Sequence, residues 1–114
     1  MAATDRLDAT FFALSHPTRR GILARLAERE ASVSELAAPF EMSQPAISKH
    51  LKVLERAGLV SVERDGQRRL RRLEPGPLVA ATEWIQRYRE VWEDNFQRLD
   101  ALLEGLQAGD KERA

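Results

Sequence analysis

Apolar residues recur along most of the chain at intervals of three and four, the spacing that places them on one face of an α-helix. The first such segment contains Leu7, Phe11 and Leu14 and ends at Ser15-His16-Pro17. Because proline is tolerated in the first turn of a helix, Pro17 indicates the start of a second helix. Four apolar residues form its expected buried face: Ile22, Leu23, Leu26 and Ala27. The charged residues of this helix, Arg19 among them, are then expected to point outward.

Capping residues predict two further helices. Ser32 and Glu35 have the S-x-x-E spacing of a capping box, so a short third helix is expected to begin there and to close at Pro39. Ser43 can cap a fourth helix, which carries Pro45 in its first turn and stops at Ala57-Gly58. Three apolar residues give this fourth helix a single buried face: Ile47, Leu51 and Leu54.

Residues 59–73 change to a period of two, which predicts a β-hairpin. Its register has two candidates. A two-residue turn at Asp-Gly places Val62 opposite Arg69, whereas a three-residue loop places Val62 opposite Leu70 and Glu63 opposite Arg69. We favour the three-residue loop, because it pairs an apolar residue with an apolar one and opposite charges with each other.

A long helix is expected to follow Pro75-Gly76-Pro77 and to extend to about Gln107, with a polar, frayed tail at 108–114. Its apolar positions alternate in threes and fours, as in the seam of a coiled coil. The seam consists of Leu78, Ala81, Ile85, Tyr88, Trp92, Asn95, Leu99, Leu102 and Leu106, and is widened by Trp84, Phe96 and Leu103. The fold class is therefore mainly α with a small β-hairpin, as one domain over residues 1–114 with a core at 7–74 and a long helix at 75–107.

Charge is unevenly distributed along this neutral chain, in which 18 Lys and Arg balance 18 Asp and Glu. Residues 1–42 carry five basic and six acidic side chains, residues 43–72 carry eight and three, and residues 73–114 carry five and nine. The corresponding net charges are −1, +5 and −4. A local excess of positive charge of this kind is typical of a nucleic-acid-binding surface.

Two short helices joined by a tight turn and followed by a basic hairpin are the parts of a winged helix-turn-helix. The fourth helix fits the major groove, where Gln44, Ser48 and Lys49 can read base edges and Lys52 and Arg56 can meet phosphates. The hairpin arginines offer a second contact in the adjacent minor groove. The predicted DNA-binding residues are Gln44, Pro45, Ser48, Lys49, His50, Lys52, Arg56, Arg64, Arg68 and Arg69.

Several of these side chains keep a second interpretation. His50 either contacts DNA or is partly buried and satisfied by a backbone carbonyl. Arg71 and Arg72 either contact DNA or pair with acidic residues, for which Glu63 and Glu74 are the candidates. His16 is expected to cap or pack at a helix junction rather than to bind a metal.

Three ordered stretches closely resemble the ArsR-type (ArsR/SmtB) bacterial transcriptional regulators: ALSHPTRRGIL at 13–23, SQPAISKHLKVL at 43–54 and AGLV at 57–60. The resemblance implies a homodimeric repressor that binds a DNA operator overlapping its promoter, with the first and last helices as the dimer interface. The interface residues expected on this basis are Leu7, Phe11, Ile85, Tyr88, Trp92, Asn95, Phe96, Leu99 and Leu102.

The resemblance also bears on metal sensing. Metal-sensing relatives use a cysteine motif in the third helix or histidine and acidic ligands in the last. Here the third helix reads ELAAP at 35–39 and the last helix has no histidine, so the chain is similar to the branch without metal ligands.

Composition excludes other classes. The chain has no cysteine, and therefore no disulfide, thiolate metal site or cysteine nucleophile. It has no glycine-rich phosphate loop and no recognisable acid/base motif, so we expect neither an enzyme nor a cofactor. The absence of an apolar signal segment or a long apolar run indicates a cytoplasmic protein without membrane contact.

One rival to DNA binding stays open at this point. The aromatic residues of the last helix could serve an interaction module or a sensor of an apolar effector, whose identity the sequence does not disclose. They are Trp84, Tyr88, Trp92 and Phe96.

Overall fold

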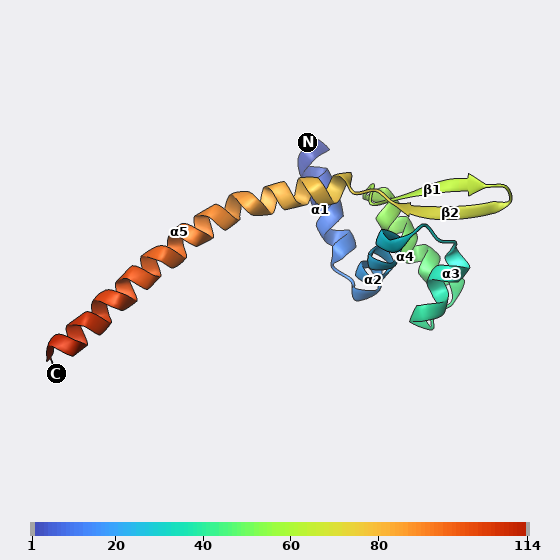
Figure 1. Ribbon diagram of the computed structural model, residues 1–114. Coiled ribbons are helices and arrows are strands. Elements are labelled where there is room, and N and C mark those ends of the chain that lie inside the picture. Colours follow the sequence, from blue (N-terminus) through green and yellow to red (C-terminus); the bar gives the residue numbers. More distant parts are fainter. Residues whose placement is uncertain (1, 114) are drawn as a thin grey trace. The chain divides into compact units, whose positions relative to one another are not determined.

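The computed structural model describes residues 2–113 of the chain, and the side chains of residues 6–109. Its elements are helices joined by short turns, with a single two-stranded antiparallel sheet in the described part (Figure 1). In order they are α1 (Ala2–Leu14), α2 (Pro17–Glu28), α3 (Val33–Ala37), the 3-10 turn η1 (Ala38–Phe40), α4 (Gln44–Arg56), β1 (Val60–Asp65), β2 (Arg68–Leu73) and α5 (Gly76–Arg113). This confirms the expected fold class. The chain forms two compact units, Met1–Ala81 and Thr82–Ala114.

The first unit packs α1 to α4 around one apolar core. Among its completely buried side chains are Ile22 of α2, Leu36 of α3, and Ile47, Leu51 and Leu54 of α4. Their spacing of three and four within each helix puts them on one face, as predicted. Each such side chain stabilises the fold by about 1.5–3 kcal/mol through the apolar surface that it removes from water.

The buried face of α2 differs from the prediction at both ends. Ile22, Leu23 and Leu26 are buried as expected, but Ala27 is exposed. Arg19, expected to point outward, is only 7% exposed. The physical reason is periodicity: position 19 precedes these three leucine and isoleucine positions by three, four and seven residues, and so lies on their face.

Helix ends follow the predicted caps. The Nδ1 atom of His16 accepts a hydrogen bond from the backbone N–H of Thr18 at 3.1 Å, which confirms its capping role at the start of α2. Ser32 and Glu35 form a complete capping box on α3. Ser43 caps α4 through Ala46, whose N–H lies 3.3 Å from its hydroxyl.

The hairpin has neither of the two registers considered. Glu63 pairs with Leu70 and Arg64 with Arg69, which leaves Gly66 and Gln67 as a two-residue turn. Gly66 has φ of +64°, the left-handed conformation that such hairpin turns require at their first central residue. The turn residues were therefore displaced by one from the Asp-Gly pair that the sequence indicated.

Burial explains why the apolar pairing of Val62 with Leu70 was wrong. Leu70 is 8% exposed, in a strand that packs against α2 and α3, so it needs no apolar partner across the hairpin. Val62, at 39% exposure, pairs instead with Arg71. The backbone of Arg71 also exchanges hydrogen bonds of 3.1 and 2.7 Å with Ala31. These bonds lie on the edge of β2 opposite β1 and help to fix the position of β2.

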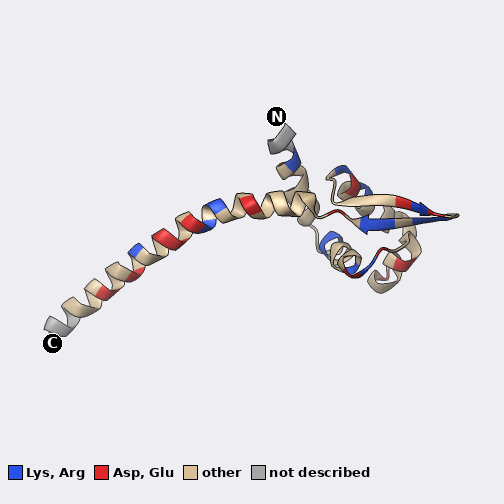
Figure 2. Ribbon diagram, turned by 45° about the horizontal axis from the view of Figure 1, so that its top comes forward, with Lys and Arg blue, Asp and Glu red and all other residues tan. Residues whose placement is uncertain are grey.

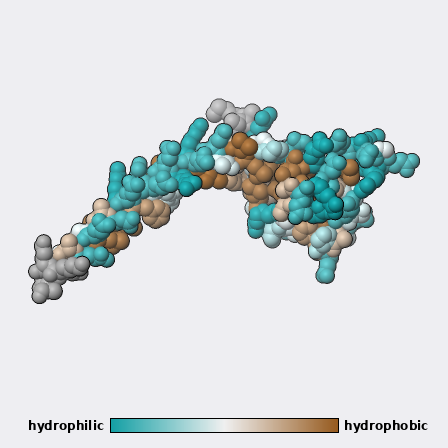
Figure 3. Space-filling model, viewed as in Figure 1, coloured by the Kyte–Doolittle hydropathy of each residue, from teal (hydrophilic) through white to brown (hydrophobic). Residues whose placement is uncertain are grey.

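Helix α5 begins at Gly76 and extends to Arg113, past the end that was predicted at Gln107. Pro77 lies in the first turn, where a missing N–H costs no hydrogen bond. Four of the six residues at 108–113 are good helix formers, Gly109 and Asp110 being the exceptions, which explains why polarity alone placed the end too early. Most of the large apolar side chains of α5 are exposed in this single chain (Figure 3).

Candidate nucleic-acid interface

Helix α4 presents a polar and basic face opposite its buried one. Ile47, Leu51 and Leu54 anchor it in the core. The predicted contact residues on its other side, Gln44, Pro45, Lys49, Lys52 and Arg56, are all exposed, while Ser48 and His50 are half-buried on the flanks. An α-helix with side chains is about 10–12 Å across, close to the width of a DNA major groove. The predicted orientation of α4 is confirmed, and contact with DNA stays a prediction.

Three of the five hairpin arginines are held by acidic side chains of the first unit. Arg71 pairs with Glu55 of α4 at 3.3 Å, which was not among the predicted partners. Arg72 pairs with Glu63 at 2.8 Å, as the second interpretation had it, and also lies 3.5 Å from Glu30. We call the hairpin the wing (residues 60–73). Glu55 fastens it to α4 and Glu30 to the segment before α3, while Glu63 joins its two strands.

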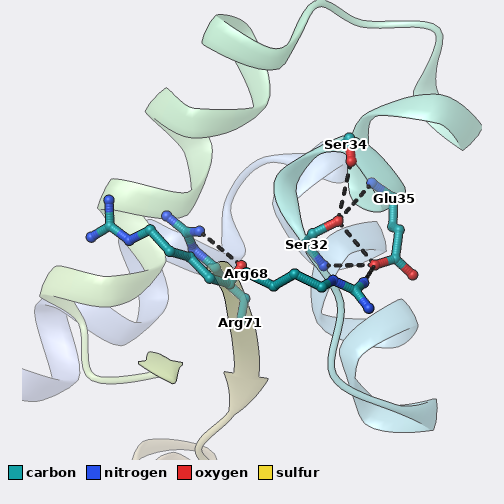
Figure 4. A network of polar contacts seen from close by, with 6 residues as sticks. Ser32, Ser34, Glu35, Arg68 and Arg71 are labelled. Atoms are coloured by element: carbon teal, nitrogen blue, oxygen red, sulfur yellow. Dashed lines mark hydrogen bonds and ion pairs between the residues drawn. The ribbon is translucent and has the colours of Figure 1, made fainter. Parts of the chain in front are cut away.

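Arg68 joins the wing to the start of α3. Its guanidinium lies 2.5 Å from Oε1 of Glu35, the same carboxylate that accepts hydrogen bonds from the backbone and hydroxyl of Ser32 (Figure 4). The hydrogen bonds from Ser32 are the main reason that the pKa of Glu35 lies below its ordinary value, and Arg68 adds to the effect. Arg68 is exposed, and the sequence predicted that it contacts DNA. That contact stays a prediction, and the side chain already pairs with Glu35.

Arg64 and Arg69 have no such partner. They face each other directly across the two strands, and neither forms an ion pair with a described residue. Together with Gly66 and Gln67 they line an open pocket at the tip of the wing. Like charges in opposite positions of a hairpin repel each other, so this tip is a favourable place for an anion.

Three basic side chains of α4 also lack an ion-pair partner. Lys49, Lys52 and Arg56 pair with no acidic group in the described part of the chain. The exposed face of α4 and the wing tip thus carry five uncompensated positive charges. Figure 2 shows basic residues gathered along the wing, whereas α5 carries mostly acidic ones.

His50 is held from inside the protein, by a side chain and not by the backbone carbonyl that was considered. Nη1 of Arg19 lies 3.2 Å from its Nδ1 atom, and the ring of His16 is 4.4 Å away between centroids. Burial, followed by the charges of His16 and Arg19, lowers the pKa of His50. Sequence reasoning missed Arg19, although its helical spacing from Ile22 and Leu26 was a usable signal.

The predicted dimer-interface residues of α5 all lie exposed: Ile85, Tyr88, Trp92, Asn95, Phe96, Leu99 and Leu102. On α1, Leu7 is half-buried and Phe11 is 36% exposed. Aromatic side chains one turn apart on α5 form tilted pairs, Trp84 with Tyr88 at 4.7 Å and Trp92 with Phe96 at 5.9 Å between centroids. Their role in dimerisation stays a prediction.

The described residues contain neither a metal-binding cluster nor a membrane-spanning helix. His, Cys, Asp and Glu side chains form no group of three there that could hold a metal ion. None of the helices described is both long and apolar enough to cross a lipid bilayer.

Comparison with known proteins gives consistent matches. A helix-turn-helix domain family matches residues 14–63. The HTH-type transcriptional regulator Rv2034 of Mycobacterium tuberculosis is 42% identical over 81 residues, which are 71% of this chain and 76% of Rv2034. The crystal structure of an ArsR family transcriptional regulator is 39% identical, with a TM-score of 0.72, and the match covers 79% of this chain and 93% of that one.

A solution structure adds an oligomeric relative. The homodimeric winged helix-turn-helix DNA-binding domain of Mb0332 from Mycobacterium bovis is 27% identical, with a TM-score of 0.63, over 79% of this chain and 85% of that one. With its helix order, its wing and these relatives, the chain belongs to the ArsR family of winged helix-turn-helix transcriptional regulators.

Proposed function

We propose that the protein is a homodimeric repressor that binds a palindromic DNA operator through α4 and the wing, and thereby blocks RNA polymerase from the promoter. One observation carries this proposal: the five cations of Lys49, Lys52, Arg56, Arg64 and Arg69 are exposed and uncompensated, while the neighbouring wing arginines are paired. Exposed cations of this kind bind phosphates and release counterions. A surface serving only as a solvated face has no need to separate its charges in this way.

The place of each side chain on α4 or the wing determines the part of DNA to which we assign it. Gln44 and Ser48 lie near the start of α4, where a recognition helix meets base edges. Lys49, Lys52 and Arg56 lie along the exposed face and are assigned to phosphates, with base contact open to Lys49. Arg64 and Arg69 are assigned to the minor groove, where a narrow A·T-rich segment attracts arginine.

A second copy of the chain accounts for the apolar surface of α5. The side chains from Ile85 to Leu106 that were expected in the seam are exposed, which a monomer in water tolerates poorly over so many positions. Two copies related by a two-fold axis would bury them and present two copies of α4. The half-sites of the operator are then expected about one helical turn apart.

The experiment is selection of bound sites from random DNA, followed by affinity measurements on the selected sequence at several salt concentrations. We expect a palindromic consensus. Lys49→Ala and Lys52→Ala should each weaken binding to all sequences alike and reduce the slope of log K against log salt by about 0.9 per half-site.

Arg98→Ala is the matched control, because it removes one exposed cation from α5 rather than from α4. Its slope should equal that of the wild type. Selection that returns no enriched sequence would refute operator binding, and unchanged slopes for both lysine variants would remove these residues from the contact surface.

A further inference from the structure

We propose that Arg19 is a positioning residue for His50, and that it holds the imidazole so that Nε2–H donates a hydrogen bond to a backbone phosphate at the edge of the operator's major groove. The inference rests on the proposed binding of DNA by α4. It concerns a buried arginine that no part of the site described above requires.

The guanidinium of Arg19 is fixed on three sides. Its Nε donates to the carbonyl oxygen of Ala13 at 2.8 Å, and its Nη2 donates to that of Phe12 at 3.0 Å. These carbonyls belong to the last turn of α1. That of Phe12 also accepts hydrogen bonds from the N–H and the hydroxyl of Ser15, so Arg19 is a further donor to it. The ring of Phe12 lies 5.1 Å from the guanidinium carbon. With two of its nitrogens committed to α1, Arg19 can present only Nη1 to α4.

The contact between Nη1 and Nδ1 determines the tautomer of His50. A guanidinium is always charged and only donates, so Nδ1 must accept with its lone pair and the ring proton must reside on Nε2. Protonation of the ring would turn Nδ1 into a donor, and its N–H would then point at the N–H of Arg19 Nη1 without an acceptor between them. The lowered pKa of His50 agrees with a neutral ring, since burial, His16 and Arg19 all disfavour its charged form.

The other groups around the ring leave this assignment intact. The described charges that act on His50 are those of His16, which precedes α2, and Arg19, which lies within it. The Nδ1 atom of His16 accepts a hydrogen bond from the N–H of Thr18, so this atom is engaged at the start of α2. Helix α1 contributes carbonyl oxygens, which bind Arg19 and not the ring.

The Nε2 atom of His50 reaches solvent. It has no hydrogen-bond partner among the described residues, and it is not among the buried polar atoms that lack one. On α4, His50 lies on the flank between the buried face and the exposed face that bears Lys49. When the exposed face enters a groove, a flank of the helix meets the groove wall, which is made of phosphates. A neutral N–H donor suits this place because the cation of Arg19 already lies behind the ring.

The tautomer can be tested on the unaltered protein. The chain has only two histidines, so their ring nitrogens can be assigned in a long-range proton–nitrogen NMR spectrum with one His16→Gln variant. We expect His50 to show an unprotonated Nδ1 and a protonated Nε2 at pH 7.5, and Arg19→Met to replace this state by a mixture. A wild-type ring protonated on Nδ1 would overturn the proposal without any DNA measurement.

Arg20→Met is the matched control. Arg20 also donates to a carbonyl of α1, that of Leu14 at 2.7 Å, but it does not contact His50. It should therefore leave the tautomer of His50 unchanged. If Arg20→Met shifts the tautomer as far as Arg19→Met does, the effect belongs to the end of α1 in general and the positioning role is wrong.

A double-mutant cycle tests the consequence for DNA. Arg19→Met and His50→Phe should each weaken operator binding about tenfold, the effect of losing one hydrogen bond to a charged group. The double variant should be no weaker than either single one, because both remove the same contact. His50→Gln carries an amide N–H that can donate from the equivalent position without needing a tautomer. It should therefore bind the operator nearly as well as the wild type, whether residue 19 is Arg or Met.

Three outcomes separate this inference from the proposed function. If the wild type binds its operator but the losses add in the double variant, Arg19 supports the fold without positioning His50, and the inference fails alone. A change in base preference with His50→Phe would also overturn it, by moving the contact from a phosphate to a base. If the wild type selects no DNA at all, the proposed function fails, whatever the tautomer.

Discussion

At the scale of single residues, the five wing arginines are alike in sequence and unlike in their surroundings. Arg71 is paired with Glu55 and Arg72 with Glu63 and Glu30, whereas Arg64 forms no ion pair with a described residue. A cation already paired with a carboxylate must give up that pair before it can bind a phosphate. Only the unpaired arginines are therefore expected to contribute fully to DNA binding.

This difference can be measured with two substitutions on the same hairpin. Arg64→Gln should weaken binding and reduce the salt slope by about 0.9 per half-site, because it removes one unpaired positive charge from the DNA-binding surface. Arg72→Gln removes the same charge from an exposed but paired position and should change the slope much less. Equal slopes for the two variants would show that the ion pairs of the free protein do not select the contacts.

Base recognition is assigned to Gln44, the first residue of α4 and an exposed one. Gln44→Ala should relax the preference at one operator position at a cost of about 1–3 kcal/mol against the best base, and leave the salt slope unchanged. Repeating the random-site selection with the variant checks this. An unaltered consensus would contradict the assignment.

At the scale of elements, the wing is attached to α3 through Glu35. The carboxylate completes the capping box with Ser32 and binds Arg68, so one side chain stabilises the start of a helix and the orientation of a strand (Figure 4). Capping was evident in the spacing of Ser32 and Glu35. The bond to Arg68 was not, because it joins residues far apart in the chain whose approach depends on how α3 and β2 pack.

The pKa of Glu35 links this attachment to pH. Because its pKa in the folded state lies below the ordinary value of 4.5, the carboxylate favours folding above that pH and loses this effect as pH falls through the lowered value. Glu35→Gln should therefore lower the free energy of unfolding at pH 7, and the deficit should shrink as the pH falls below 4.5. Urea denaturation at fixed protein concentration measures it.

Glu28→Gln is the control for this prediction. Glu28 is exposed and lies 3.9 Å from Arg25, outside any capping box. Its substitution should change the free energy of unfolding little at either pH. A pH dependence as large as that of Glu35→Gln would mean that general charge, and not the cap and the wing contact, is responsible.

At the scale of the whole molecule, the main question is what covers the apolar residues of α5. Trp92 is 59% exposed in the single chain, in the middle of the predicted seam. Trp92→Glu should yield monomers in analytical ultracentrifugation, because a dimer would have to bury the new charge. Operator binding should weaken with it, since one copy of α4 meets only one half-site.

Glu93→Gln serves as the control. It lies next to Trp92 on the same helix, pairs with Arg89 at 3.2 Å and does not belong to the seam. It should sediment as a dimer. A dimer that persists in Trp92→Glu would place the interface elsewhere and leave the aromatic residues of α5 without this role.

Local patterns in the sequence determined the elements and the chemistry of the recognition helix. Caps at His16, Ser32 and Ser43, apolar spacing in α2 and α4, and the basic stretch at 43–72 are properties of neighbouring residues, and the structure contains these helices as expected. Such features depend on interactions within a turn or two of chain, which a sequence shows directly.

Tertiary structure alone decided which basic side chains form ion pairs and which do not. The register of the wing depends on the burial of Leu70 and on the hydrogen bonds between Ala31 and Arg71. The neutral charge total concealed the five unpaired cations of α4 and the wing. The other three wing arginines pair with acidic residues of α3, α4, β1 and the segment before α3. The link from Arg19 to His50 joins residues 31 positions apart. No local pattern encodes such contacts, since they exist only after the helices have packed.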